Sequence, residues 1–441
     1  MLYWQPFHIQ KNENQIIEFM NHTEPIYANV TSEIGELEAV ILHTPGREVE
    51  SMTPANAQRA LYSDILNLSV ASYEYEQLQG VLNKVTKVFQ VKTLLEEILQ
   101  EEKVRQKLIE RICSAEKILN IRDYLLELDA KELSRQLIEG SEFKYDSLTN
   151  YLSEERYALR PLHNFFFTRD ASMTLHEQVL IGKMANGVRE RESMIMEAIF
   201  NHSKQVSAKT INPASFYNIE PETKIEGGDV LIARHDITII GNGVRTSTQG
   251  IDFIINQMKQ RKERHYIVVQ QLPHKPESFI HLDMVFTLLD RDQCMVYEPV
   301  ILHPGNLLTI LIEIDNGIVK RIEKKPDLLA CLKELGMDLK PILCGGNKDV
   351  WNSEREQWHS GANFFAMAPG KVLGYERNTY TMEAMNNHGY EIIPAIDVLN
   401  NSINLDNYSK YVVTIEGSEL SRGGGGARCM TMPFKRKTVL W

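Results

Sequence analysis

The segment His281-Leu-Asp283 places an imidazole and a carboxylate two residues apart. On a strand, both side chains would point to the same side and face one pocket. The histidine could then act as a general acid or base beside a carboxylate that orients it or binds a cation. The pair could also be half of an iron(II) site completed by a distant His303, His359 or His388. A buried histidine with a purely structural role is the third interpretation.

Further carboxylates stand in similar surroundings. Asp170 ends the run Phe165-Phe-Phe-Thr-Arg-Asp, and Glu226-Gly-Gly-Asp229 holds two acids around two glycines. Glycines let a backbone approach a ligand closely, although a plain turn fits equally well. With Asp283, these segments indicate a weak structural repeat in which a strand ends in an acid.

Cys429 follows four consecutive glycines, Gly423 to Gly426. Such a loop is mobile or lets a ligand approach, and a cysteine beside a histidine and carboxylates is typical of a nucleophile. The other cysteines form no C-x-x-C pair, which favours a reducing compartment over a disulfide framework or a zinc site. We predict packing roles for these four, which are Cys113, Cys294, Cys331 and Cys344.

The acidic surroundings predicted for Cys429 indicate a class of substrate. Several carboxylates disfavour a thiolate and raise the pKa of the thiol. Such a site suits a substrate that brings positive charge. A planar guanidinium fits because carboxylates can hold it through paired N–H bonds.

Composition describes an ordinary globular protein. The chain has 441 residues, and its formal net charge of −11 argues against a general nucleic-acid binder. No stretch is apolar enough for a membrane span, and the N-terminus lacks the apolar region of a signal peptide. We therefore expect a soluble cytoplasmic protein.

Periodicity divides the chain into two kinds of structure. Residues 81–139 contain no Gly or Pro and carry apolar residues at helical spacing. Helices are also predicted over 191–201 and 248–262. Short apolar or β-branched runs predict strands at 38–43, 178–182, 236–241, 265–269 and 293–297. The fold class is therefore α/β, interrupted by an all-α insert.

Taken in order, the motifs resemble those of the arginine deiminase family along nearly the whole chain. They include Leu42-His-Thr-Pro-Gly-Arg-Glu-Val-Glu, Phe167-Thr-Arg-Asp, Ile225-Glu-Gly-Gly-Asp-Val-Leu, His281-Leu-Asp-Met-Val-Phe-Thr, Glu354-Arg-Glu-Gln-Trp-His-Ser-Gly-Ala-Asn and Cys429-Met-Thr-Met-Pro. The resemblance implies a pentein fold, an α/β-propeller of about five ββαβ units around a central site. It also implies a helical insert, which we place at 71–150, with the catalytic domain at 1–70 and 151–441.

The resemblance also implies a role for each acidic or nucleophilic residue. Cys429 would attack the guanidinium carbon, and His281 would protonate the departing ammonia and later activate water. Asp170 and Asp283 would clamp the guanidinium, while Glu226 would assist at its nitrogens and orient His281. The implied reaction converts L-arginine and water to L-citrulline and ammonia, without a metal or organic cofactor.

The far end of the substrate would meet a second group of residues. Asn164, Arg189 and Arg245 match positions that hold the α-carboxylate, and Phe167 matches a residue that lines the aliphatic stem. Gly424 stands where many family members carry an arginine that helps gate the site. The resemblance also implies a homodimer or homotetramer.

Other functions remain open at this point. A pentein relative could act on methylated arginine or transfer the amidino group, because the catalytic core is shared. A catalytically inactive arginine-binding protein would tolerate the loss of Cys429. An iron oxygenase leaves Cys429 and the glycine run without a role.

Overall fold

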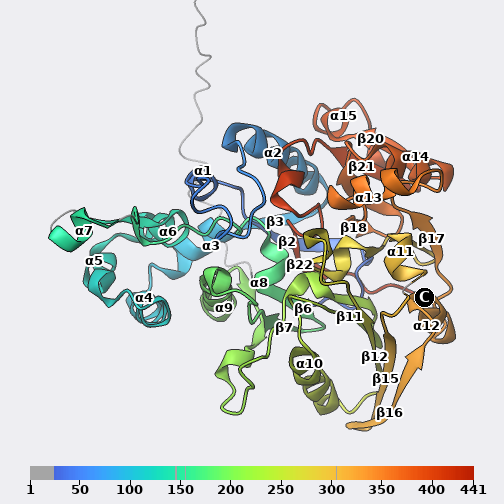
Figure 1. Cartoon of the computed structure of the whole chain (residues 1–441), viewed down its shortest axis with the longest axis horizontal. Helices are drawn as coiled ribbons and strands as arrows, with labels where there is room; N and C mark the ends of the chain where they lie inside the picture. Colours follow the sequence, from blue (N-terminus) through green and yellow to red (C-terminus); the bar gives the residue numbers. More distant parts are fainter. Residues whose placement is uncertain (1–23, 145–146, 154, 304) are drawn as a thin grey trace, which may run out of the picture.

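The computed structural model of the chain describes residues 24–144, 147–153, 155–303 and 305–441. Figure 1 shows a ring of small β-sheets and a group of helices that projects from one side of it. Among the described residues, no helix is both long and apolar enough to cross a membrane. The N-terminal stretch that lacks the marks of a signal peptide lies outside this part of the chain.

Each sheet of the ring is built from one repeated unit. Strands β6 (Ser172–Leu175) and β7 (Gln178–Ile181) run antiparallel. Helix α9 (Glu190–His202) then crosses over, and β9 (Lys209–Ile211) returns parallel to β7. The order is ββαβ, because a parallel partner needs a crossover connection.

The other four units repeat this order. Their strands and crossover helices are β10 (Val230–Arg234), β11 (Ile237–Asn242), α10 (Thr248–Gln260) and β12 (His265–Gln271); β13 (Phe286–Leu288), β14 (Gln293–Val296), α12 (Leu328–Glu334) and β17 (Lys340–Leu343); β18 (Phe365–Ala368), β19 (Lys371–Tyr375), α14 (Thr379–Asn387) and β21 (Tyr411–Ile415); and β22 (Met432–Arg436), β2 (Leu37–Leu42), α2 (Leu68–Val85) and β3 (Lys87–Gln90). Two sheets are extended, one by β15 (Thr309–Asp315) and β16 (Ile318–Lys325) and one by β20 (Glu391–Pro394). The expected five ββαβ units are confirmed.

The ring is closed by strands that lie far apart in the sequence. β22 pairs antiparallel with β2, which pairs in parallel with β3. Figure 1 shows these strands near the centre, with the crossover helices α2, α9, α10, α12 and α14 around the outside. The N-terminal ends of the first strands of the units therefore meet around one centre.

The strands and helices form where the side-chain pattern predicts them. The five predicted strands are confirmed as β2, β7, β11, β12 and β14, and the two predicted helices as α9 and α10. The side chain of Ser247 caps α10 by accepting a hydrogen bond from the backbone N–H of Gly250. Apolar residues of α9, such as Ile195 and Ile199, are buried in a core that also contains Val179 of β7.

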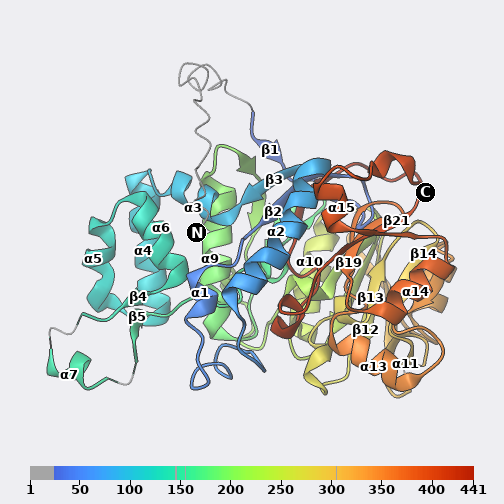
Figure 2. The same cartoon turned by 90° about the horizontal axis from the view of Figure 1, so that it is seen from above.

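The projecting helices follow β3 (Figure 2). They are α3 (Val91–Ile98), α4 (Glu102–Glu116), α5 (Arg122–Glu127) and α6 (Ala130–Glu139), followed by α7 (Leu148–Tyr151) and the short strands β4 (Ser141–Glu142) and β5 (Tyr157–Leu159). The domain boundaries of 71 and 150 stay a prediction. Helix α2, most of which falls inside them, connects two strands of the ring.

The remaining short elements complete the chain. They are β1 (Ile26–Tyr27), α1 (Arg47–Glu50), α8 (Thr168–Ala171), β8 (Val206–Ser207), α11 (Glu298–Ile301), α13 (Val350–Trp358) and α15 (Ala395–Leu399), together with the 3-10 turns η6 (Gly227–Asp229) and η8 (Leu282–Met284). The turns η6 and η8 each lie just before the first strand of a unit and carry site residues.

Two sequence-based interpretations are wrong. His281 and Asp283 do not lie on a strand, because His281 precedes the turn η8 and Asp283 is inside it. The recurring acids do not end strands either, since Asp170 and Glu226 come before β6 and β10. Around this turn, His281 contacts Glu226 and Asp283 contacts Arg428.

Candidate active site

Every unit of the ring contributes a polar side chain just before its first strand. Asp170 precedes β6, Glu226 precedes β10, His281 precedes β13, Asn363 precedes β18 and Cys429 precedes β22. All five side chains are buried. Because the first strands begin around one centre, segments distant in the sequence supply one site.

His281 lies between two carboxylates. Its Nε2 is 2.9 Å from Oε2 of Glu226, and its Nδ1 is 3.7 Å from Oδ1 of Asp170. Burial alone would lower the pKa of His281, but Asp170 and Glu226 outweigh it and raise the pKa to about 9. The ring is therefore a cation near neutral pH and holds a proton that it can donate.

Cys429 has an environment that opposes its ionisation. Its Sγ lies 3.7 Å from Oδ2 and 3.9 Å from Oδ1 of Asp283. Burial, and then the carboxylates of Asp283 and Asp170, raise the pKa of the thiol well above its usual value. The free site therefore holds a thiol, and a positive charge placed among these groups would favour the thiolate.

Asp170 and Asp283, which are predicted to clamp the guanidinium of the substrate, each already contact the guanidinium of an arginine of the protein. Nη1 of Arg189 lies 2.7 Å from Oδ2 of Asp170, and Nη1 of Arg428 lies 2.7 Å from Oδ2 of Asp283. Oδ1 of Asp170 has no hydrogen-bond partner among the described residues. Each aspartate is thus anchored through Oδ2, while Oδ1 of Asp170 lies 3.7 Å from Nδ1 of His281 and Oδ1 of Asp283 lies 3.9 Å from the sulfur of Cys429.

The anchoring arginines are themselves held by other carboxylates. Nε and Nη2 of Arg189 donate to Glu192, at 2.8 to 3.1 Å. Arg428 donates through Nε to Glu33 at 3.0 Å. These buried pairs fix the aspartates more firmly than isolated charges would.

The residues predicted to bind the α-carboxylate end lie in several places. Arg245 contacts Glu226 at 3.4 Å and lines a cavity of about 420 Å³ that Gly424 also lines. Nδ2 of Asn164 donates to the carbonyl of Ala60 at 2.7 Å, and Arg189 contacts Asp170 rather than this cavity. Their roles toward a substrate remain predictions.

Phe167 supports the glycine loop. A side chain on Gly425 would place its Cβ 2.5 Å from the Phe167 ring, so the absence of a side chain lets the loop lie against that ring. Gly424 has a φ of +84°, in the left-handed region that favours glycine, and open space where a Cβ would stand. The loop therefore has room at Gly424, whereas it is packed at Gly425.

The proposed iron site does not form around His281. His303 contacts Glu298, His359 faces Arg377, and His388 bonds the carbonyl of Ala384. Asp170, Glu226 and His281 do offer three ligand atoms within 4.8 Å of one another, an arrangement that could hold a cation. Arg189 and Arg245 already supply positive charge to these two carboxylates, however.

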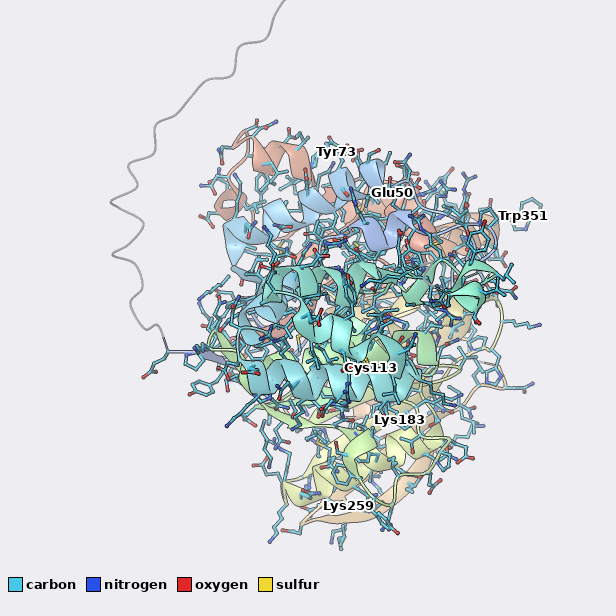
Figure 3. All side chains as sticks on the ribbon, turned by 90° about the vertical axis from the view of Figure 1, so that its left-hand side faces the viewer. Glu50, Tyr73, Cys113, Lys183, Lys259 and Trp351 are labelled. Atoms are coloured by element: carbon cyan, nitrogen blue, oxygen red, sulfur yellow. The ribbon has the colours of Figure 1, made fainter. Side chains whose placement is uncertain are left out.

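The other four cysteines are packing residues, as predicted. All are buried and reduced. Cys113 lies in α4 within the projecting helices, which face the viewer in Figure 3, while the remaining three lie in the core of the ring.

Two residues of the site were missed from the sequence. Asn363 contacts the sulfur of Cys429 at 3.2 Å, and Arg428 anchors Asp283. Asn363 ends one of the motif segments, and its place before a strand is the signal that could have indicated it. Arg428 adjoins Cys429, but only the fold shows that it turns to Asp283.

The fold and the arrangement of the site define a pentein protein. The solved structure of the N-terminal domain of ArgZ bound to product, an arginine dihydrolase from the ornithine-ammonia cycle in cyanobacteria, matches 90% of this chain and 97% of that one, at 12% identity and a TM-score of 0.51. SxtG, an amidinotransferase from Microseira wollei, matches over 94% and 98% of the two chains, at 13% identity and a TM-score of 0.50. These likenesses concern the fold alone.

Sequence comparison identifies the family. The family described as arginine deiminase matches residues 58–436. An arginine deiminase of Bacillus cytotoxicus is 33% identical over 430 residues, covering 93% of this chain and 99% of that relative. One of Streptococcus agalactiae serotype Ia is 31% identical over 442 residues, covering 95% and 100%. The chain belongs to the arginine deiminase family, and the predictions of a pentein fold and of an arginine-hydrolysing enzyme are confirmed.

Proposed function

We propose that this site hydrolyses the guanidinium group of free L-arginine, giving L-citrulline and ammonia through a covalent amidino-cysteine intermediate. One observation carries the assignment of roles. A buried thiol and a protonated His281 stand among carboxylates that face the centre, and this arrangement calls for a cationic substrate.

Binding uses the oxygens that Arg189 and Arg428 do not hold. The guanidinium contacts Oδ1 of Asp170 and Oδ1 of Asp283, while Arg189 and Arg428 hold the other oxygen of each. Charge-assisted hydrogen bonds to two separate carboxylates fix the orientation of the guanidinium as well as its position. The guanidinium carbon is then presented to the sulfur of Cys429.

The aliphatic stem and the α-carboxylate of the arginine contact a second group of residues, away from Cys429. Arg245 holds the α-carboxylate, whereas Arg189 and Asn164 would have to leave their contacts with Asp170 and with the carbonyl of Ala60 to reach it. Phe167 lines the aliphatic stem, and Gly424 lies beside the entrance. The cavity shared by Arg245 and Gly424 supports this direction of approach.

The first half of the reaction forms the intermediate. The bound cation favours the thiolate, so Cys429 gives its thiol proton to solvent water, and the sulfur then forms a bond to the guanidinium carbon. His281 gives its proton to one terminal nitrogen, the C–N bond breaks, and ammonia leaves. Glu226, which contacts Nε2 of His281 at 2.9 Å, holds the ring for this transfer.

The second half uses water. His281, now neutral, takes a proton from a water molecule whose oxygen bonds to the amidino carbon. The C–S bond then breaks, the O–H proton of the product passes to the departing sulfur, and citrulline leaves with the thiol of Cys429 restored. His281 has regained its proton, so the site is ready for the next arginine.

The test incubates the purified protein with L-arginine and measures citrulline and ammonia. We expect equimolar products from the native protein and none from Cys429→Ser, which should still bind arginine in calorimetry because the aspartates remain. Cys344→Ser, a change at a buried cysteine of the core, is the control and should retain turnover. Loss of arginine binding in the folded Cys429→Ser variant would contradict this division of roles.

The same assay addresses the other pentein activities. A folded protein that releases nothing from arginine but acts on methylated arginine, or transfers the amidino group to an amine, would replace the proposal. The homodimeric or homotetrameric state is a further prediction, to be measured by light scattering. The cytoplasmic location likewise remains a prediction.

A further inference from the structure

We propose that Asn363 is a catalytic residue of this reaction, whose side-chain N–H donates to the sulfur of Cys429 and stabilises the attacking thiolate. The inference rests on the proposed function. Asn363 lies two residues before β18, in the short segment that precedes the first strand of its unit, and the other four units carry Asp170, Glu226, His281 and Cys429 in the corresponding segments. It is thus the contribution of the one unit that otherwise supplies nothing to the site.

The hydrogen bonds of Asn363 fix which end of its amide faces the sulfur. Oδ1 accepts from the backbone N–H of Arg428 at 2.9 Å and of Cys429 at 3.2 Å. Nδ2 donates to the backbone carbonyl of Asp283 at 3.1 Å and to Sγ of Cys429 at 3.2 Å. A reversed amide would set its NH₂ group against two N–H donors, so this orientation is the satisfied one.

The sulfur has opposite neighbours on its two sides. The carboxylate of Asp283 disfavours the thiolate, whereas the N–H of Asn363 favours it. A bound guanidinium offsets the negative charge of Asp283. The N–H of Asn363 then stabilises the thiolate, and the charge of Asp283 no longer disfavours it. A preorganised donor in a buried site is worth more than the same contact in water.

This contact acts twice in each turnover. It stabilises the thiolate before the sulfur attacks the guanidinium carbon, and again when the C–S bond breaks and the sulfur leaves. Asn363 is buried, with 1% of its surface exposed, so water does not compete for the sulfur on that side.

The two ends of the Asn363 amide have different partners, so a substitution can test a catalytic role separately from a structural one. Oδ1 supports the backbone at Arg428 and Cys429, and Nδ2 serves the sulfur. Asn363→Asp keeps the acceptor at nearly the same volume and replaces the donor with an oxygen that cannot donate when ionised. Gln357→Glu is the matched control, because Gln357 is a buried amide that bonds Ser278 and the Met284 carbonyl without contacting the sulfur.

The experiment measures the pH dependence of Cys429 alkylation by iodoacetamide, with the modified cysteine identified by mass spectrometry. This readout needs no turnover, so it is independent of whether arginine is the substrate. In Asn363→Asp we expect the profile to move by at least one to two units to higher pH, because about that much comes from the lost hydrogen bond and the ionised carboxylate adds a negative charge beside the sulfur. Asn363→Ser removes the donor without adding charge and should move the profile by about one to two units in the same direction. Gln357→Glu should leave the profile in place.

Turnover provides the second readout. We expect kcat of Asn363→Asp to fall by about 10²- to 10³-fold, as for the loss of one preorganised donor, with KM changed far less. If Asn363→Asp does not fold, Asn363→Ser, which cannot reach the sulfur, replaces it in both measurements. An unmoved alkylation profile in a folded variant would overturn the proposal, even if the native protein makes citrulline. Absence of citrulline from the native protein, with a shifted profile, would instead refute the proposed function.

Discussion

The charge on His281 is set by the carboxylates around its ring. Burial would favour a neutral imidazole, yet Asp170, Glu226 and Asp229 together raise its pKa to about 9. Because this pKa lies above the usual value of about 6.5, the charged ring stabilises the fold below about pH 6.5. That stabilisation is lost as the pH rises through about 9. The same carboxylates therefore keep on the His281 ring the proton that the ring gives to the leaving nitrogen in the reaction.

We predict that His281 titrates near pH 9 in the free protein. Carbon-13 NMR of labelled histidine should show it, with the resonance assigned from a His281→Gln variant. His176 and His265 are internal controls, because burial lowers their pKa values to about 4 and about 3 and both stay neutral. A His281 midpoint near 6.5 would show that the carboxylates do not act on the ring as described.

The turn η6 brings a backbone into contact with the His281 ring. A Cβ on Gly228 would lie 2.5 Å from Cγ and Nδ1 of His281, closer than side-chain atoms tolerate. The second glycine of the Glu226-Gly-Gly-Asp229 segment is thus required by close approach, whichever conformation the turn adopts. Asp229 adds a second contact between the two turns. Its side chain accepts a hydrogen bond from the backbone N–H of Leu282 at 2.9 Å, which holds η8 against η6.

Gly228→Ala should therefore displace the imidazole without unfolding the ring of sheets. We expect kcat to fall by about 10²-fold, the effect of misplacing a catalytic group by about 1 Å. Gly187→Ala is the control, since no atom lies within 4 Å of the Cβ it would add. Steady-state kinetics with a circular dichroism check would decide, and equal activity of the two variants would mean that the ring tolerates the contact.

Local patterns predicted elements better than they predicted the site. The run Asp236-Ile-Thr-Ile-Ile-Gly indicated a strand because β-branched residues suit a buried sheet, and β11 forms there. His281-Leu-Asp283 alternates like a strand, but it forms a turn that is held by one hydrogen bond from the backbone N–H of Leu282 to Asp229, a residue of another unit. The position of Asn363 at the end of a motif segment did not show its partner, since its contact with Cys429 spans 66 residues and depends on how the ring closes.

Over the whole molecule, a buried ion pair joins the two ends of the described chain. Arg428 donates to Glu33 through Nε and Nη2, at 3.0 and 3.1 Å. Burial opposes ionisation of Glu33, but Arg428 outweighs it and lowers the pKa to about 2. Since this pKa lies below the usual value of about 4.3, the pair stabilises the fold above that pH, and the stabilisation is lost as the pH falls through about 2.

Glu33→Gln should lower the free energy of unfolding by about 3–5 kcal/mol at neutral pH, because it removes one of the two carboxylate charges that pair with the buried guanidinium of Arg428. Glu38→Gln is the control. Glu38 faces Lys435 at 3.8 Å in a half-exposed pair that also links β2 to β22, and such pairs contribute about 0–1 kcal/mol. Urea unfolding would measure both. The cost of Glu33→Gln should shrink between pH 5 and pH 2, and a cost that does not change with pH would contradict the assignment.

The pairing of β22 with β2 also has a consequence for biosynthesis. Strand β2 is made early, yet its partner follows every other unit of the ring, so one edge of β2 stays open while the intervening units are synthesised. Open edges attract other strands, and contacts this distant in sequence slow folding. A chain interrupted before Met432 would retain Cys429 but lack the strand that holds it in place. We expect such fragments to aggregate rather than to consume arginine.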